Sequence, residues 1–130
     1  MARDVAFTDR ELDVMEVLWD SGSATVSEVQ GRIADDLAYT TVLTVLRVLE
    51  EKGYVRHEEE GRAHRYLPTV ERADARRSAL DRMIGRVFGG SEEALLTQLV
   101  GDRGLSAKTA ARIRAMLDER LDAPDGEEES

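Results

Sequence analysis

The chain has 130 residues, the length of one compact domain or of a small domain with an appendage. It contains no cysteine and two histidines, which excludes disulfides, thiolate metal sites and cysteine nucleophiles and leaves too few imidazoles for a metal site. No apolar run approaches the roughly 18 residues that cross a bilayer, and the N-terminus lacks a charged-then-apolar signal pattern. We therefore expect a cytoplasmic protein with no cofactor.

The net charge of −9 argues at first sight against a nucleic-acid partner, because DNA-binding proteins carry a surplus of Lys and Arg. Several acids, however, lie in the segment 122–130, which its composition predicts to be a disordered acidic tail. The other acidic side chains are expected on solvated helix faces, above all on the first predicted helix: Asp9, Glu11, Asp13, Glu16 and Asp20. DNA binding then depends on whether one face is locally basic.

The first helix is predicted by a capping box, in which Thr8 is the N-cap and Glu11 follows three residues later. Phe7 and Leu12 are spaced to form a hydrophobic staple across it. Inward-facing apolar residues then recur at helical spacing until residues 21–23 end the helix: Leu12, Met15, Leu18 and Trp19.

A second capping box, Thr25 with Glu28, predicts a short helix whose inward residues are Val29 and Ile33. A third helix is predicted from about Thr40 to Lys52, where Gly53 stops it. The period then changes to two, which predicts a β-hairpin with strands 54–57 and 62–67, a loop at 58–61 and Pro68 at its end.

From Val70 onward the pattern is helical again, in three pieces separated by Gly89-Gly90 and by the segment before Ser106. Ser91 is the predicted N-cap of the second piece and Ser106 of the third. Each piece is too short to be stable alone, so we expect a second copy of the chain to cover a dimerisation surface. Its predicted residues are Leu80, Ile84, Val87, Phe88, Leu95, Leu96, Leu99, Ile113, Met116 and Leu117.

The predicted fold class is therefore mainly α with a small β-hairpin wing. Residues 1–69 form a winged helix-turn-helix domain, residues 70–121 a helical dimerisation region, and residues 122–130 the acidic tail.

The third helix carries the predicted function. One face, with Val42, Val45, Leu46 and Leu49, is assigned to the core, and the opposite stripe consists of Thr40, Leu43, Thr44 and Arg47. Such a stripe suits a major groove better than a solvated face, because Arg pairs with guanine O6 and N7, Thr with base edges, and Leu with a thymine methyl. Thr41 is placed to contact a phosphate.

The hairpin adds Arg62, His64 and Arg65, which lie just past the loop and are expected to grip phosphate. The loop acids Glu58–Glu60 oppose entry of the hairpin tip into a minor groove. We therefore expect the base of the wing to make the contacts.

Several segments together resemble the BlaI/MecI family of penicillinase repressors: residues 8–19, Ala38-Tyr39-Thr40-Thr41-Val42-Leu43-Thr44-Val45-Leu46, Glu51-Lys52-Gly53-Tyr54-Val55 and Arg62-Ala63-His64-Arg65-Tyr66. The resemblance runs from about Thr8 to Leu121. It implies a homodimer on a palindromic DNA operator, with base readout from residues 40–47, and repression of genes for β-lactam resistance or cell-wall stress. It also implies relief by proteolysis in the C-terminal region, triggered by a membrane-embedded sensor metalloprotease.

Two departures from the family pattern matter. Staphylococcal members are cut at an Asn-Phe bond, and Gln98-Leu99 stands at that place here. Copper-responsive relatives carry a cysteine-rich C-terminal motif, which this chain lacks, so copper sensing by that chemistry is excluded.

Other functions are weaker interpretations of the sequence. An enzyme is disfavoured, because the chain has no Gly-rich phosphate loop, no nucleophile elbow and no carboxylate pair beside a histidine. A small-molecule-responsive winged-helix repressor stays open, since Trp19 and the C-terminal apolar stripe are candidates to line a pocket. A winged-helix protein-interaction module also stays open, because it would suit the acidic charge.

Overall fold

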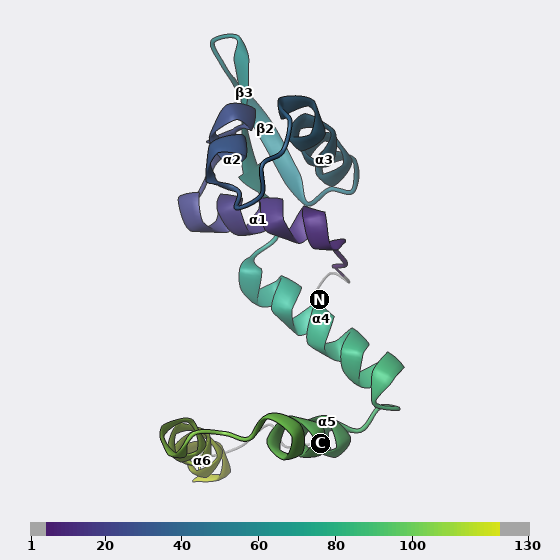
Figure 1. Ribbon diagram of the computed structural model, residues 1–130, viewed down its shortest axis with the longest axis vertical. Helices are drawn as coiled ribbons and strands as arrows, with labels where there is room; N and C mark the ends of the chain where they lie inside the picture. Colours follow the sequence, from purple (N-terminus) through teal and green to yellow (C-terminus); the bar gives the residue numbers. More distant parts are fainter. Residues whose placement is uncertain (1–4, 123–130) are drawn as a thin grey trace. The chain divides into compact units, whose positions relative to one another are not determined.

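The computed structural model describes residues 5–122, in the element order shown in Figure 1. The predicted order of three helices, a hairpin and further helices is confirmed. The chain divides into two compact units between Met83 and Ile84, and each unit is described by itself.

Helices α1 (Asp9–Ser21), α2 (Val26–Arg32) and α3 (Tyr39–Glu51) form the helical part of the N-terminal unit. Both predicted capping boxes are present. The Glu11 amide donates to Thr8 Oγ1 at 3.1 Å and the Thr8 amide donates to Glu11 Oε1 at 2.9 Å. The corresponding distances in the box of Thr25 and Glu28 are 3.2 Å and 3.3 Å. Because each box satisfies two amides that lack helical partners, it determines where its helix begins.

Strands β1 (Ala24–Thr25), β2 (Val55–Glu60) and β3 (Ala63–Pro68) form an antiparallel sheet in the order β1-β3-β2. The sequence did not predict β1, because two residues are too short to show a period. The predicted loop at 58–61 is wrong. The ladder continues to the Glu60–Ala63 pair, and the turn is Gly61-Arg62 with Gly61 at φ +63°. Glycine suits this left-handed conformation, so the hairpin is longer than predicted.

The core of the N-terminal unit forms where the three helices meet the sheet. Its fully buried large side chains are Val5, Val14, Met15, Leu18, Val29, Val42, Leu46, Leu49 and Tyr66. The predicted inward positions Met15, Leu18, Val29 and Ile33 are confirmed.

The predicted inward face of α1 was partly wrong. Leu12 is 39% exposed, whereas Glu11, expected on a solvated face, is 5% exposed. The buried stripe of α1 runs through positions 11, 14, 15 and 18, so Leu12 is turned about 100° away from its first member. The carboxylate of Glu11 is accommodated because the Thr8 amide and Lys52 bond to it.

The remaining helices are α4 (Arg72–Val87), α5 (Glu92–Gln98) and α6 (Ala107–Asp122), with a π-helical turn, η1 (Leu99–Arg103), directly after α5. The three predicted helical pieces are confirmed, and so are their caps. The Ala94 amide donates to Ser91 Oγ at 2.9 Å, and the Thr109 amide donates to Ser106 Oγ at 3.1 Å. The sequence did not predict the π-helical turn.

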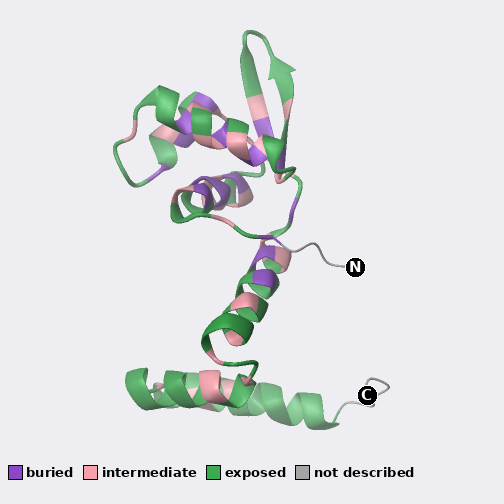
Figure 2. Ribbon diagram, turned by 90° about the vertical axis from the view of Figure 1, so that its right-hand side faces the viewer, coloured by how far each residue is buried: buried purple, intermediate pink, exposed green. Residues whose placement is uncertain are grey.

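Burial differs sharply between the two units, as the colours in Figure 2 show. Residues 84–122, the described part of the second unit, include no buried residue. The start of α4, in the first unit, is anchored instead: Ala75 and Ser78 are buried, and the Val5 amide donates to Ser78 Oγ at 3.2 Å. Helices α5 and α6 therefore have no core within one copy of the chain.

None of the helices within residues 5–122 is both long enough and apolar enough to span a bilayer. The acidic tail predicted for 122–130 lies outside the described residues, apart from Asp122, which ends α6.

Candidate nucleic-acid interface

Helix α3 buries one face and leaves the opposite face open. Val42, Leu46 and Leu49 are fully buried. The predicted stripe lies largely on the open face, where Thr40, Thr41, Thr44 and Arg47 are exposed. The prediction was incomplete at two positions. Val45 was assigned to the core and Leu43 to the open stripe, but both are half-buried and pack against the core.

Arg47 is the cation on this open face of α3. No ion pair joins it to any carboxylate within residues 5–122, whereas the arginines at positions 10, 56, 65, 72 and 77 are all paired. Its donors are therefore available to an external acceptor.

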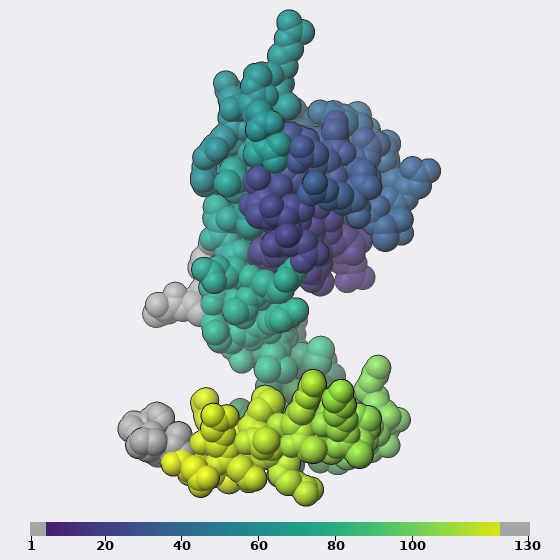
Figure 3. Space-filling model, turned by 90° about the vertical axis from the view of Figure 1, so that its left-hand side faces the viewer, coloured from purple at the N-terminus to yellow at the C-terminus, as the bar shows by residue number. Residues whose placement is uncertain are grey.

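The wing is the β2–β3 hairpin, which extends as a narrow projection beyond the body of the N-terminal unit (Figure 3). Its turn holds Arg62, which is exposed and has no ion pair with the described residues. Because the turn comprises Gly61 and Arg62 alone, the tip of the wing is cationic and not acidic as the sequence suggested.

Two of the three wing glutamates lie in ion pairs within the hairpin. Glu58 Oε2 lies 2.9 Å from Arg56 Nη1, and Glu60 Oε1 lies 2.7 Å from Arg65 Nε. Glu59 lies opposite His64 in the ladder. The acidic run therefore opposes DNA binding less than its sequence implies.

His64 is exposed and stacks on His57, with ring centroids 4.1 Å apart and an interplanar angle of 12°. His57 in turn bonds through Nδ1 to Glu50 Oε2 of α3 at 2.7 Å. His64, which the sequence predicts to contact a phosphate, therefore stacks on the histidine that links the wing to α3 through a hydrogen bond.

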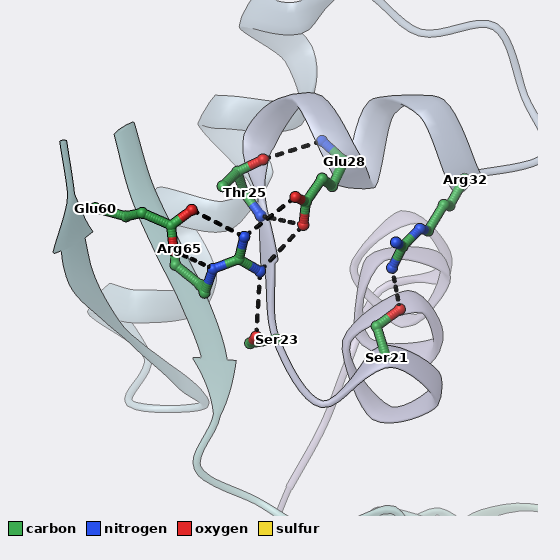
Figure 4. Close-up of polar contacts among 7 residues, drawn as sticks. All are labelled: Ser21, Ser23, Thr25, Glu28, Arg32, Glu60 and Arg65. Carbon is green, nitrogen blue, oxygen red and sulfur yellow. Dashed lines mark hydrogen bonds and ion pairs between the residues drawn. The ribbon is translucent and has the colours of Figure 1, made fainter. Parts of the chain in front are cut away.

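The Arg65 side chain points toward Glu28 of α2 (Figure 4). Its guanidinium bonds to Glu60, Glu28 and Ser23, and its side chain is 25% exposed. The hydrogen bonds to Glu60 and then to Glu28 raise the pKa of Arg65, and the bond from Arg65 lowers the pKa of Glu28. The guanidinium of Arg65 is thus bound within the protein, whereas Arg47 and Arg62 have no ion pair with the described residues.

Two residues that the sequence did not assign to the DNA-binding region belong to it. Tyr39, the first residue of α3, is 47% exposed beside Thr40. Its position directly before Thr40 in the sequence could have indicated that it belongs to the same exposed surface. Glu28 bonds to Arg65 from 37 residues away, and no local pattern indicates such a pairing.

A cavity of about 320 Å³ lies in the N-terminal unit next to Trp19. Trp19 Nε1 donates to the Val70 carbonyl at 2.8 Å, and the Arg72 guanidinium carbon lies 5.4 Å from the centre of the indole ring. The cavity is lined by Val5, Phe7, Leu12, Glu16, Trp19, Arg72, Ala75, Arg76, Ala79 and Arg82. It combines an apolar, aromatic wall with arginine side chains.

Comparisons with known proteins agree with this architecture. The model of the penicillinase repressor family matches residues 7–119. The transcriptional regulator BlaI of Mycobacterium tuberculosis is 34% identical over 116 residues, which cover 86% of this chain and 84% of the relative. The penicillinase repressor of Bacillus licheniformis is 25% identical over 114 residues, with coverages of 86% and 89%.

Among solved structures, the DNA-binding domain of the repressor BlaI aligns with a TM-score of 0.50 and 32% identity. The alignment covers 57% of this chain and 93% of that domain. The chain thus belongs to the penicillinase repressor family, whose members are transcriptional repressors that bind DNA and are not enzymes.

Proposed function

We propose that two copies of this chain bind a palindromic DNA operator, with α3 in the major groove and the wing on the flanking backbone. The observation that carries the proposal is the open face of α3, on which Arg47 has no ion pair with the described residues. A solvated helix face is ordinarily rich in Lys and Glu, whereas this face combines hydroxyls with one available guanidinium.

Each residue of the stripe has a chemical role in this arrangement. Arg47 donates two hydrogen bonds to O6 and N7 of a guanine, the contact that contributes most to base discrimination. Thr40 and Thr44 bond to base edges, and Thr41, at the first turn of α3, bonds to a phosphate. The exposed part of Leu43 meets a thymine methyl group.

The wing contributes charge and no base readout. Arg62 at the tip binds a phosphate, and His64, the second residue of β3, binds a neighbouring phosphate. Because Glu58 and Glu60 lie in ion pairs within the wing, the wing approaches the DNA backbone with less repulsion than its run of three glutamates suggests.

A second copy of the chain is the proposed partner of α5, α6 and the end of α4. Several large apolar side chains are exposed there, and no described residue after Met83 is buried. Apolar faces of this extent are covered in soluble proteins, and a two-fold dimer covers the same face on both chains. The exposed members are Leu80, Met83, Val87, Leu96, Leu99, Val100, Met116, Leu117 and Leu121.

The proposed target genes and release mechanism rest on the membership of this chain in the family. We propose that the operator controls genes of β-lactam resistance or cell-wall stress, since a relative is named a penicillinase repressor. We also propose that a sensor protease pathway relieves repression by cleavage in the C-terminal region. Gln98-Leu99, which stands where staphylococcal members of the family are cut, lies at the junction of α5 and η1.

The experiment that tests this function is a fluorescence-anisotropy titration of the full chain at several salt concentrations. The duplex is selected by the protein from a random library, and a scrambled duplex of the same length serves as control. We expect two chains per duplex, a palindromic consensus and binding about 10³-fold tighter than to the scrambled duplex. Equal binding to both duplexes would overturn the proposal.

The cavity beside Trp19 favours a second candidate, in which a small molecule modulates DNA binding. Its volume of about 320 Å³ reaches the lower end of small-molecule sites. Its aromatic wall and Arg76, which has no ion pair with the described residues, suit an aromatic carboxylate. Trp19 is the only tryptophan, so its fluorescence reports occupancy directly. Titration with benzoate and 1-naphthoate, with benzamide as the uncharged control, tests this candidate. Unchanged fluorescence with both carboxylates would contradict it.

A further inference from the structure

Arg65 lies at a junction of three elements. It belongs to β3, where its neighbours in the sheet are Thr25 of β1 and Glu58 of β2. Its side chain reaches Glu60 near the end of β2 and Glu28 in the first turn of α2 (Figure 4). We refer to Arg65, Glu28, Glu60 and Ser23 as the Arg65 cluster.

The cluster occupies every donor of the guanidinium. Arg65 Nε donates to Glu60 Oε1 at 2.7 Å, and Nη2 donates to Glu60 Oε2 at 3.0 Å and to Glu28 Oε2 at 3.1 Å. Nη1 donates to Glu28 Oε1 at 3.1 Å and to Ser23 Oγ at 3.3 Å. An arginine has five N–H groups, so none is left for a phosphate. Both carboxylates are held by paired hydrogen bonds, the arrangement in which arginine binds most strongly and with a defined orientation.

The cluster also connects the wing to the helix-turn-helix. Glu28 is the residue that closes the capping box of α2, and its Oε1 also accepts a bond from the Thr25 amide at 3.3 Å. The N-terminus of α2 therefore holds the Glu28 carboxylate in place independently of its bonds to Arg65. Helix α2 packs in turn against α3, which carries Arg47. The Gly61-Arg62 turn lies directly beyond Glu60, at the end of the hairpin that the cluster ties down.

We propose that Arg65 is a positioning residue: its paired bonds to Glu28 and Glu60 set the direction of the wing relative to α2 and α3, so that Arg62 and Arg47 reach the same duplex, and Arg65 itself contacts no phosphate. This inference rests on the proposed DNA-binding function. From its charge alone, Arg65 would be expected to contact the DNA backbone. The inference assigns it a structural role within the protein instead.

The first test compares Arg65→Lys with Arg56→Lys in the full chain. Lysine keeps the positive charge but cannot make paired bonds to two carboxylates. Arg56 is the matched control because it lies on the same wing and makes one exposed ion pair, with Glu58. For a positioning residue, Arg65→Lys weakens operator binding by about five- to tenfold, a change of roughly 1 kcal/mol, and Arg56→Lys by less than about twofold. Undiminished affinity of Arg65→Lys would overturn the inference.

Two further variants separate positioning from phosphate binding. Glu28→Gln keeps the helix cap but removes a carboxylate from Arg65. It weakens DNA binding if Arg65 positions the wing, whereas it tightens binding if Arg65 is a phosphate ligand released from its partner. In an Arg62→Ala background the added Arg65→Lys change costs less than about twofold, because the guanidinium that Arg65 positions is already absent. Tighter binding by Glu28→Gln, or an equal loss in both backgrounds, contradicts the inference.

Amide hydrogen exchange without DNA keeps this test separate from the proposed function. Glu28→Gln and Arg65→Lys are expected to speed exchange in residues 58–64 relative to the Arg56→Lys control, with the exchange of α1 unchanged. Unchanged exchange in the wing would overturn the inference whatever the DNA result. Faster exchange in the wing of both variants, together with no sequence-specific DNA binding by the unsubstituted protein, would instead overturn the proposed function. The part of the inference that concerns DNA would then fail with it.

Discussion

The carboxylate of Glu11 on α1 lies 2.7 Å from the ammonium of Lys52, the residue that follows α3. Burial of Glu11 acts to raise its pKa, but the hydrogen bonds from Lys52 and from the Thr8 amide together outweigh this, so its pKa lies below the ordinary value. One side chain thus closes the cap of α1 and ties α1 to the end of α3, the helix that carries the proposed DNA contacts.

The Glu11–Lys52 pair predicts a loss of stability in acid. Because the folded pKa of Glu11 is lowered, its contribution is present above the unfolded value of about 4.5 and is lost as the pH falls through the folded pKa. Glu11→Gln keeps the cap but removes the charge, and we expect it to lower the free energy of unfolding at neutral pH by roughly 1–2 kcal/mol. Urea denaturation between pH 3 and pH 7 (roughly the window that this linkage covers) measures both effects.

The matched control for Glu11→Gln is Glu51→Gln on α3, since Glu51 is exposed and has no ion pair with the described residues. We expect that change to shift the free energy of unfolding by less than about 0.5 kcal/mol. Equal destabilisation by both substitutions would show that the Glu11–Lys52 pair is not the cause.

Arg47→Ala is expected to reduce affinity for the selected operator by about 1–3 kcal/mol and to relax the preference at one base pair. The reason is the loss of two hydrogen bonds to one guanine, which no neighbouring side chain of α3 replaces. Anisotropy titration combined with a repeated selection from the random library measures both effects. Arg77→Ala on α4, where Arg77 pairs with Asp74 at 2.8 Å, is the control for loss of one positive charge. Unchanged affinity and base preference in Arg47→Ala would instead support a protein-interaction module.

Arg62→Ala is expected to weaken binding to every sequence by a similar factor, because the turn of the wing supplies charge and no base readout. The slope of log affinity against log salt concentration falls in magnitude by about 0.9, the change expected when the protein neutralises one phosphate fewer. Titrations of the selected and scrambled duplexes at four or more salt concentrations measure this slope. A weakening confined to the selected duplex would refute the backbone role.

Leu117→Asp is expected to dissociate the dimer and to abolish tight operator binding without unfolding the N-terminal unit. Leu117 is 58% exposed on α6, so in the proposed dimer the new charge would be buried at an interface. Light scattering coupled to size-exclusion chromatography gives the mass, and Trp19 fluorescence reports the fold of the N-terminal unit. Ala111→Asp, an exposed position about opposite Ile113 on the same helix, introduces the same charge as a control.

The Leu117→Asp experiment also tests the dimer model itself. A variant that is monomeric at the assay concentration and still binds the full operator with undiminished affinity would show that dimerisation does not contribute to operator binding. Dissociation by Ala111→Asp as well would indicate that the charge acts through loss of helix stability and not at a dimer interface.

The sequence by itself determined the features that depend on nearby residues. The boxes of Thr8 with Glu11 and Thr25 with Glu28 were predictable because a helix N-terminus brings residues three apart into contact whatever surrounds it. The buried and open faces of α3 followed from the helical period, with Leu43 and Val45 misjudged because side chains at the edges of a stripe contact both core and solvent.

The tertiary structure alone decided which charges are available. Lys52 meets Glu11 across 41 residues, and Arg65 meets Glu28 across 37, so neither pairing is implied by any local spacing. Both depend on how α1, α2, α3 and the sheet pack around one core. The same packing places Arg65 in ion pairs with two carboxylates. It leaves Arg47 and Arg62 without an ion pair to the described residues, although all three are arginines of one candidate DNA-binding region. An arginine's role here is set by the carboxylates that the fold brings within about 3 Å, and that distance is a property of the packed domain.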